Sequence, residues 1–235
     1  MITLNINNNS YKIPTDWKDV SLCMYEKLST DYNNDTTVEM LFTNTFNVLK
    51  EDFDCIKEEM LLYILGKLSF TTTDVIIEDN PTFIYEGKHY SIVNDTSKLS
   101  VGEWVDFEGK LLAEASITDL LSVIVRDDIA KYDSDNNKVR KELFYNNMNV
   151  VSALSFFKKY MSMREAIFSS FEPLFNSNDE EPSGSKNIVN WGWIGFLFGL
   201  CNKDITKVEE ISQYSLILAL NWAMYQNDMT KNLKQ

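Results

Sequence analysis

Several residue types on which catalysis commonly relies are scarce in this sequence. Its 235 residues include one histidine, His89, and eight glycines. No cysteine or carboxylate flanks His89 at ligand or triad spacing, so a side chain at the edge of a turn is the expected role. The HExxH motif and the P-loop are absent, and so few glycines disfavour a phosphate-binding loop. We therefore predict that the protein is not an enzyme and that it has no catalytic, metal-binding or cofactor-binding residues.

Cysteines and long hydrophobic runs are also few. The three cysteines, Cys23, Cys55 and Cys201, are widely spaced and form no CxxC pair, which favours reduced thiols in a cytosolic setting. The N-terminus lacks a basic segment followed by an apolar one, so no secretory signal is predicted. Each of the two apolar runs near the C-terminus is about a dozen residues long, whereas a membrane span needs roughly twenty. No membrane span is expected.

Positive charge is in short supply. There are 22 lysines and arginines against 35 acidic residues, which gives a net charge of −13. An acidic chain without a basic cluster is poorly suited to nucleic-acid phosphates or to an anionic membrane surface. We therefore expect no direct nucleic-acid recognition and no membrane partner, and interpret the acidity as a source of solubility.

The alternation of apolar and polar residues predicts a β-hairpin at the start of the chain. Residues 2–6 and 11–13 alternate, and three asparagines between them favour a turn. Ser21 is placed to cap a short helix that turns Leu22, Tyr25 and Leu28 inward. A hairpin followed by a helix resembles the opening of a β-grasp (ubiquitin-like) unit.

The rest of the chain is predicted to be mainly helical. Helices are expected over residues 37–49, 52–68 and 118–125 and over a long region, 138–175, that breaks near 146–149, with strands over 75–77, 82–85 and 90–93. The fold class is therefore α+β, a mainly helical body with small β-hairpins and a C-terminal helical hairpin.

Two acidic loops imitate calcium-binding loops. Asp133 begins a run with oxygen ligands at positions one, three and five, but Lys138 and Phe144 stand where glycine and glutamate are needed. The run that begins at Asp31 fails in the same way. Both are interpreted as solvated loops that cap the helices after them.

An acidic, polar stretch divides the chain. Residues 176–186 contain no hydrophobic side chain and include proline, glycine, serine and acids, which is typical of a linker. The predicted organisation is an α+β body over 1–175, this linker, and an aromatic C-terminal segment over 187–235.

The C-terminal segment is the most distinctive part of the sequence. Burial of the aromatic side chains in its first apolar run would contribute at most roughly 15–25 kcal/mol of hydrophobic free energy. Gly192, Gly195 and Gly199 recur at spacings that would form a groove on a helix. The segment packs either within its own chain, as an ordinary helical hairpin, or on another protein. The candidate interface residues are Trp191, Trp193, Phe196, Phe198, Trp222 and Tyr225, with Trp104 from the apolar segment 99–108.

Several short segments carry a family resemblance. The run Ser100-Val-Gly-Glu-Trp-Val-Asp-Phe-Glu108 resembles a strand or turn that precedes a helix in proteins of tailed phages infecting Bacteroidetes, including crAss-like phages. The opening from Ile6 to Trp17 and the ending around Trp191, residues 204–207 and Trp222 are similar to theirs too. Asp127-Asp128 departs from the family pattern, which has proline there.

The resemblance implies a role in particle assembly. Such proteins are virion structural proteins or tail-assembly chaperones, so we expect a ring or connector subunit between portal and tail. It would form a homo-oligomeric ring, bind other phage structural proteins, and reside in the virion after assembly in the host cytoplasm. The alternative is a tail-assembly chaperone absent from the finished particle. A small regulatory or host-directed enzyme is a further alternative, and it would predict a polar pocket around His89 or the acidic loops.

Overall fold

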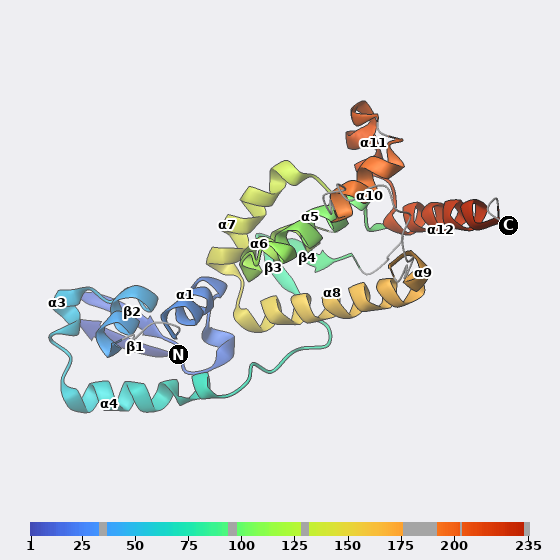
Figure 1. Cartoon of the computed structure of the whole chain (residues 1–235). Helices are drawn as coiled ribbons and strands as arrows, with labels where there is room; N and C mark the ends of the chain where they lie inside the picture. Colours follow the sequence, from blue (N-terminus) through green and yellow to red (C-terminus); the bar gives the residue numbers. More distant parts are fainter. Residues whose placement is uncertain (33–36, 94–97, 128–131, 176–191, 203, 233–235) are drawn as a thin grey trace.

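The computed structural model describes residues 1–32, 37–93, 98–127, 132–175, 192–202 and 204–232. The fold is α+β and mainly helical, as the sequence predicts, and within the described residues it has one two-stranded and one three-stranded antiparallel sheet. Figure 1 shows an elongated chain in which the N-terminal elements and the last helix lie at opposite ends.

The predicted N-terminal hairpin is confirmed. Strands β1 (Ile2–Ile6) and β2 (Asn9–Ile13) pair in antiparallel register, with Leu4 opposite Tyr11. Asn7 and Asn8 join them with φ angles of 45° and 67°, a left-handed conformation that asparagine tolerates better than most residues. Within the described residues this sheet has two strands, so the likeness to a β-grasp unit does not extend beyond the hairpin and helix.

The helices that follow are more broken than the periodicity predicts. The first, α1 (Leu22–Tyr32), begins as expected, because the Met24 amide donates to Ser21 Oγ at 3.2 Å. The continuous helix expected over 37–49 is wrong: α2 (Val38–Met40) passes into a π-helical turn, Leu41–Thr45, and ends there. The helix expected over 52–68 is also wrong, because the chain forms α3 (Lys50–Phe53) and α4 (Glu58–Lys67).

Asp52 joins α3 to the hairpin. Its carboxylate accepts hydrogen bonds from Asn7 Nδ2 at 2.9 Å, from Asn9 Nδ2 at 2.7 Å and from the Tyr11 hydroxyl. The side chain is almost fully buried, so these donors replace the water that a carboxylate needs. The contact is long-range, which explains why helical periodicity alone does not locate the end of α3.

The second sheet confirms one predicted hairpin and corrects another strand. Strands β3 (Phe83–Tyr85) and β4 (Lys88–Ile92) form the expected hairpin, and β5 (Val125–Asp127) pairs with β4. The strand expected over 75–77 is absent. The backbone there runs beside α8 (Val150–Ser170), and the Glu78 amide donates to Ser155 Oγ at 2.8 Å instead of to a neighbouring strand.

The middle of the chain is helical. The predicted buried helix is α6 (Ile117–Ile124), and the long helical region divides as expected into α7 (Asn137–Asn147) and α8, followed by the short α9 (Glu172–Phe175). Asn149 caps α8 by accepting from the Ser152 amide at 2.9 Å. Asp133 caps the 3₁₀ turn Ser134–Asn136 before α7, whereas α7 itself has no side-chain cap, so the cap expected of this loop is on the turn and not on the helix.

One further helix was not expected. The segment predicted as a strand or turn forms α5 (Val101–Leu112), and Ser100 and Glu103 make a reciprocal capping box at its start. The Glu103 amide donates to Ser100 Oγ at 3.1 Å, and the Ser100 amide donates to Glu103 Oε2 at 2.9 Å. The Ser-x-x-Glu spacing was visible in the sequence and would have identified this helix.

In place of the predicted helical hairpin, the described residues of the C-terminal segment form α10 (Gly192–Leu200), α11 (Val208–Ser212) and α12 (Leu216–Asn232). These C-terminal helices share a core with the rest of the chain, because Leu216 and Leu220 lie in the main hydrophobic cluster with Trp104. A separate cluster, which includes Phe42 and Ile64, fills the N-terminal end. No helix in the described residues is long and apolar enough to cross a bilayer. The linker predicted at 176–186 lies outside the described residues, so the domain boundaries stay a prediction.

The Asp52 contacts predict how the stability of the hairpin depends on pH. The hydrogen bonds from Tyr11, Asn9 and Asn7 lower the pKa of Asp52 below its ordinary value of 3.8. The stabilisation is therefore present above pH 3.8 and is lost as the pH falls through the lower, folded-state pKa. We expect Asp52→Asn to speed hydrogen exchange of the β1–β2 amides at pH 7, with a difference that shrinks below pH 3.8.

Asp54→Asn is the matched control for this experiment. Asp54 lies two residues away and is exposed, in a surface ion pair with Lys50. Its substitution is expected to leave exchange in the hairpin unchanged. Equal effects of the two substitutions would contradict the role given to Asp52.

Candidate functional site

Helix α5 lies at the centre of the chain and is buried on most of its surface. Trp104 and Phe107 are fully buried, and the carboxylates Glu103 and Glu108 are buried with them. Burying a charge is costly unless a partner replaces its water. The surroundings of α5 are therefore the first place to look for a site.

Each buried carboxylate of α5 has a cationic partner. Arg126 Nε of β5 lies 3.2 Å from Glu103 Oε1. Arg164 of α8 binds Glu108 through two nitrogens, at 2.5 and 2.9 Å, and stacks on the Phe168 ring. Burial raises the pKa of Glu103 above its ordinary value of 4.5, although Arg126 and the Ser100 hydrogen bonds act in the opposite direction.

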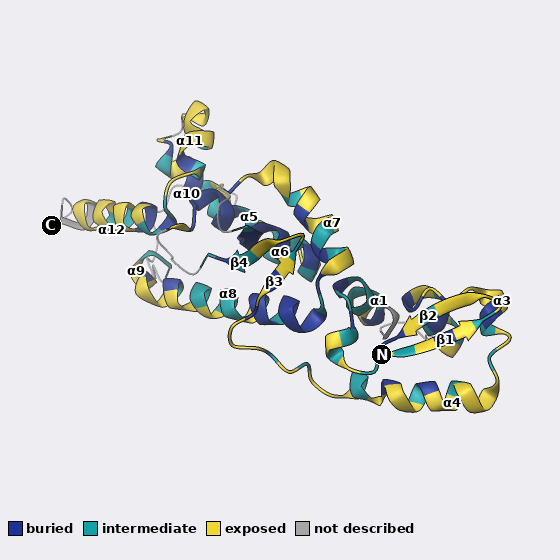
Figure 2. Cartoon of the chain, turned by 180° about the vertical axis from the view of Figure 1, so that it is seen from behind, coloured by how far each residue is buried: buried dark blue, intermediate teal, exposed yellow. Residues whose placement is uncertain are grey.

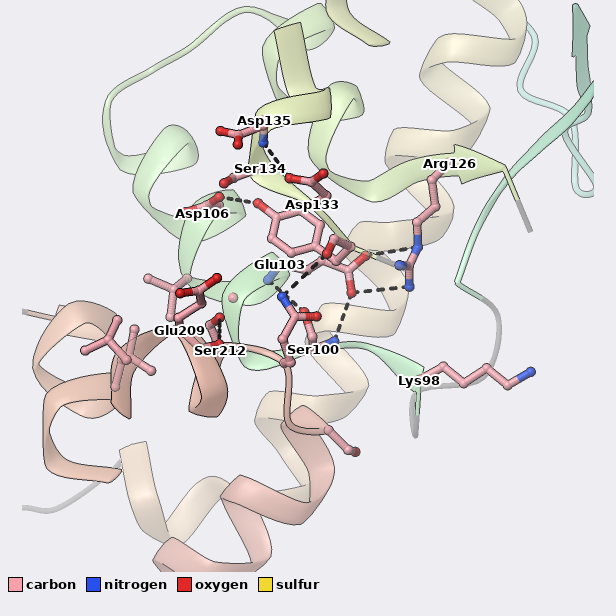
Figure 3. Close-up of a pocket in the computed structure, with 17 residues that line it drawn as sticks. Lys98, Ser100, Glu103, Asp106, Arg126, Asp133, Ser134, Asp135, Glu209 and Ser212 are labelled. Carbon is pink, nitrogen blue, oxygen red and sulfur yellow. Dashed lines mark hydrogen bonds and ion pairs between the residues drawn. The ribbon is translucent and has the colours of Figure 1, made fainter. Parts of the chain in front are cut away.

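A polar cavity of about 1110 Å³ opens beside this ion pair (Figure 3). Its walls come from α5, from the loop before α7 and from α11, and its charged lining residues are Lys98, Glu103, Asp106, Arg126, Asp133, Asp135 and Glu209. Several of them bind one another: Tyr132 donates to Asp106, and the Asp135 amide donates to Asp133 at 2.9 Å. The Tyr132–Asp106 contact joins the loop before α7 to α5, whereas the Asp133–Asp135 contact lies within that loop.

The cavity brings together no nucleophile and histidine base. His89 lies on β4 opposite Ile84, is exposed, and does not line the cavity. Among the residues that the structure describes, no group of three or more His, Cys, Asp or Glu side chains is arranged to hold a metal ion. The enzyme alternative predicts a polar pocket around His89 or the acidic loops. His89 does not line this cavity, whereas Asp133 and Asp135 of one acidic loop do.

The C-terminal helices close against the start of α5. The Val101 amide donates to the Tyr214 carbonyl at 2.9 Å, and the Leu216 amide donates to the Leu99 carbonyl at 2.7 Å. Val101 and Val105 pack with Leu197 of α10 and other apolar residues of this segment. A large part of the C-terminal segment therefore packs within its own chain, as one of the two predicted arrangements requires.

The structure separates the candidate interface residues into two groups. Trp104 is fully buried, which contradicts its assignment to an interface. Trp193 is half-buried with its ring centroid 5.3 Å from that of Trp104, and it also packs on the half-buried Phe196. These three aromatic residues pack in the core. The sequence alone could not distinguish aromatic residues of a core from those of an interface. Trp191 lies outside the described residues.

The second group lies on the outside of α10 and α12. Phe198 is 36% exposed, whereas Trp222 and Tyr225 are 51% and 55% exposed, with ring centroids 5.7 Å apart. A Cβ on Gly192 or Gly199 would meet nothing within 4 Å, so no other described segment packs closely on α10 at these two glycines. The exposed part of the segment therefore centres on α12.

Sequence reasoning missed two members of this surface. Leu218 is 63% exposed and Met229 is 46% exposed, and with Trp222 and Tyr225 they recur at spacings of four, three and four residues. We call these four residues the outer stripe of α12. The opposite side of the helix, at Leu216 and Leu220, is fully buried in the body. Figure 2 shows α12 exposed over most of its length, with its buried residues at the start of the helix.

The spacing of the outer stripe is that of a helix-pairing seam. Apolar residues that alternate at three and four residues place their side chains along one line, as in knobs-into-holes packing. Beside the stripe lies a hollow of about 290 Å³ lined by residues such as Leu200, Leu218 and Trp222. The stripe and hollow form an apolar surface suited to a protein partner.

Comparisons with protein-family models, with curated proteins and with solved structures find no match for this chain. Its function is therefore argued from the surfaces described above.

The buried ion pair predicts an unusual dependence of stability on pH. Because the pKa of Glu103 is raised, the folded protein holds this proton to higher pH than the unfolded chain. Its contribution to stability is greatest below pH 4.5 and falls as the pH rises through the folded-state pKa. Arg126→Met removes the opposing charge and enlarges that fall. We expect Arg126→Met to lower the free energy of unfolding, measured by urea denaturation, by about 3–5 kcal/mol at pH 7.5 and by less at pH 5.

The double variant Glu103→Gln/Arg126→Met is the control, because glutamine keeps the capping acceptor without a buried charge. It should recover most of the lost stability and its pH dependence. A loss in Arg126→Met that is the same at both pH values would contradict the assignment to Glu103.

Two glycines of α5 test the contact with the C-terminal helices. A Cβ on Gly102 would lie 3.1 Å from both Cβ and the carbonyl oxygen of Ser212, whereas one on Gly109 would meet nothing within 4 Å. We expect Gly102→Ala to lower the free energy of unfolding, measured by urea denaturation, by about 1–2 kcal/mol. Gly109→Ala should instead stabilise by about 0.5–1 kcal/mol, because alanine favours the helix. Equal effects would mean that α11 does not pack closely on α5.

Proposed function

We propose that this chain is a non-enzymatic assembly subunit that acts through protein–protein contacts, and that the outer stripe of α12 is its main contact surface. The observation that carries the proposal is the exposure of four large apolar side chains at helix-pairing spacing. Four such side chains, each about half exposed, present roughly 400 Å² of surface, a size that marks interaction sites.

The charge of the chain supports the same interpretation. The net charge of −13 keeps an unassembled subunit soluble and disfavours phosphate partners. Between Leu216 and Met229, however, the only charged side chain of α12 is Asp228. The helix is therefore the part of an acidic surface on which another protein can pack with little electrostatic repulsion.

The family resemblance in the sequence makes the proposal more specific. In a tailed phage the subunit would belong to the ring or connector between portal and tail, and would bind other structural proteins of the particle. It would be assembled in the host cytoplasm and retained in the virion. Retention follows from the proposal, because a connector subunit remains part of the particle that it builds.

A tail-assembly chaperone is the second candidate. The hollow beside Trp222, together with the outer stripe, would then receive an apolar segment of a client tail protein. The two candidates differ in outcome, because a chaperone leaves before the particle is complete. Quantitative mass spectrometry of purified particles separates them: a fixed copy number favours the connector, and absence favours the chaperone.

Substitution on the outer stripe tests the contact surface itself. We expect Trp222→Glu to remove the subunit from assembled particles, because a charge on the seam cannot be buried without a partner. Folding stability should change little, since the side chain is half exposed and glutamate favours a helix. The measurement is the copy number in purified particles, with the thermal midpoint of the isolated protein beside it.

Val139→Glu is the matched control. Val139 is 66% exposed on α7, away from α12, and the change introduces the same charge. It should be incorporated as the wild type is. Normal incorporation of Trp222→Glu would overturn the assignment of the outer stripe.

A further inference from the structure

The hairpin at the start of the chain has one strand, β1, whose second edge is unpaired. Within the described residues β1 pairs with β2 alone, and the sheet has no third strand. The two-residue turn makes Ile6 and Asn9 a hydrogen-bonded pair, and hydrogen-bonded and non-hydrogen-bonded pairs alternate from there. The backbone N–H and C=O groups of Thr3 and Asn5 therefore point away from β2.

These outward groups of β1 are not used elsewhere in the structure. Among the described residues, no hydrogen bond from another segment engages the backbone of Thr3 or Asn5. Both side chains are exposed on the outer side of the hairpin. A row of unpaired N–H and C=O groups along a strand is a template on which another extended segment can pair.

Among the edge strands of the described residues, β1 has the least protection against such pairing. Proteins shield their edges with lysine, with proline, with bulges or by keeping the strand short. The opposite edge of the same sheet, β2, carries Lys12 and is followed by Pro14, and the two edge strands of the other sheet, β3 and β5, are each three residues long. In contrast, β1 has five residues in unbroken register, and none of them is charged.

The sequence of β1 is complementary to itself in the antiparallel direction. Ile2-Thr-Leu-Asn-Ile6 is apolar, polar, apolar, polar and apolar from either end. In an antiparallel pair of β1 strands centred on Leu4, Ile2 of one copy lies opposite Ile6 of the other on the inner face. Thr3 lies opposite Asn5 on the outer face. Leu4 is buried in a single copy but Ile2 and Ile6 are only half-buried, and this pairing would cover both of them.

We propose that β1 pairs with β1 of a second copy of this chain, antiparallel and centred on Leu4, so that the two hairpins form one four-stranded sheet. Thr3 of one copy and Asn5 of the other then exchange two hydrogen bonds, and the two-fold symmetry repeats this pair on the other side of Leu4. Figure 1 shows the hairpin at the opposite end of the molecule from α12. The contact is therefore separate from the outer stripe of α12 and does not rest on the proposed function.

The charge of the hairpin permits this contact between two acidic chains. Residues 1–13 contain no acidic side chain, and their one basic side chain is that of Lys12, on β2. In the four-stranded sheet the two β1 strands lie between the lysines of the two copies. At ~4.8 Å per strand the lysines are about 14 Å apart, beyond the ~8 Å over which charges act at physiological salt. The net charge of −13 is carried outside the hairpin and does not oppose the pairing there.

Proline substitution in the hairpin tests the contact. Asn5→Pro removes an outward N–H of β1 and leaves the hydrogen bonds to β2 in place. By light scattering after size exclusion, we expect the wild type to dimerise and Asn5→Pro to dimerise at least about tenfold more weakly, because each dimer loses two hydrogen bonds. Ser10→Pro is the matched control. Ser10 lies opposite Asn5, and its N–H points to the other edge of the sheet, so this variant should dimerise as the wild type does.

Cysteines at two exposed positions test the register without disturbing the hairpin. Opposite residues of a hydrogen-bonded pair have Cα atoms ~5.5 Å apart, within the range of a disulfide, whereas Thr3 of one copy and Thr3 of the other would be diagonal neighbours at ~7–8 Å. The exposed Cys55 is first replaced by serine in both variants. On mild oxidation, an equimolar mixture of Thr3→Cys and Asn5→Cys should form a disulfide-linked dimer of one copy of each. Neither variant alone should crosslink to a comparable extent.

Three results would overturn the proposal. A wild type that stays monomeric at about 100 µM would exclude the second copy, and the particle measurement would then judge the proposed function separately. Equal dimerisation of Asn5→Pro and Ser10→Pro would remove the edge of β1 from the contact. Loss of the dimer in Trp222→Glu would assign self-association to α12 and leave the proposed function standing.

The cysteine pair decides the outcome if proline disturbs folding. Thermal midpoints and circular dichroism spectra of all variants are compared with those of the wild type. Where Asn5→Pro unfolds the hairpin, a mixture of the two cysteine variants that fails to crosslink overturns the proposal by itself.

Discussion

The burial of α5 is the constraint on which the rest of the structure depends. A helix surrounded on nearly all sides brings its carboxylates into the interior, and each then requires a fixed partner. Glu103 accepts a hydrogen bond from the Ser100 amide and pairs with Arg126, and Glu108 pairs with Arg164. These contacts fix β5 and α8 relative to α5, because a buried ion pair tolerates little displacement.

The burial of α5 also explains how the C-terminal helices pack. The start of α5 has to be covered, and the chain covers it with α10, α11 and the inner side of α12. Most of the aromatic surface of this segment is buried in that way. The outer stripe of α12 remains, and it is consequently a more specific candidate surface than the whole segment.

At the N-terminal end, too, a buried carboxylate requires fixed partners. Asp52 is buried and collects donors from the β1–β2 hairpin, while Phe42 and Ile64 fill a separate apolar cluster. This cluster is complete within the N-terminal elements, and it includes Ile64 from the inner side of α4.

The sequence by itself determined the features that depend on neighbouring residues. The asparagine turn, the Ser21 cap, the helix break before Asn149 and the α+β class all follow from local chemistry. Only the tertiary structure decided which aromatic residues face inward. Trp104 and Trp222 are the same residue type in similarly apolar surroundings, yet one is fully buried and the other is half exposed. Composition requires that such surface be covered, but the partner is set by contacts between distant segments, as between α5 and α11. A helix with apolar residues on both sides, such as α12, has no periodicity that reveals which side meets its own chain.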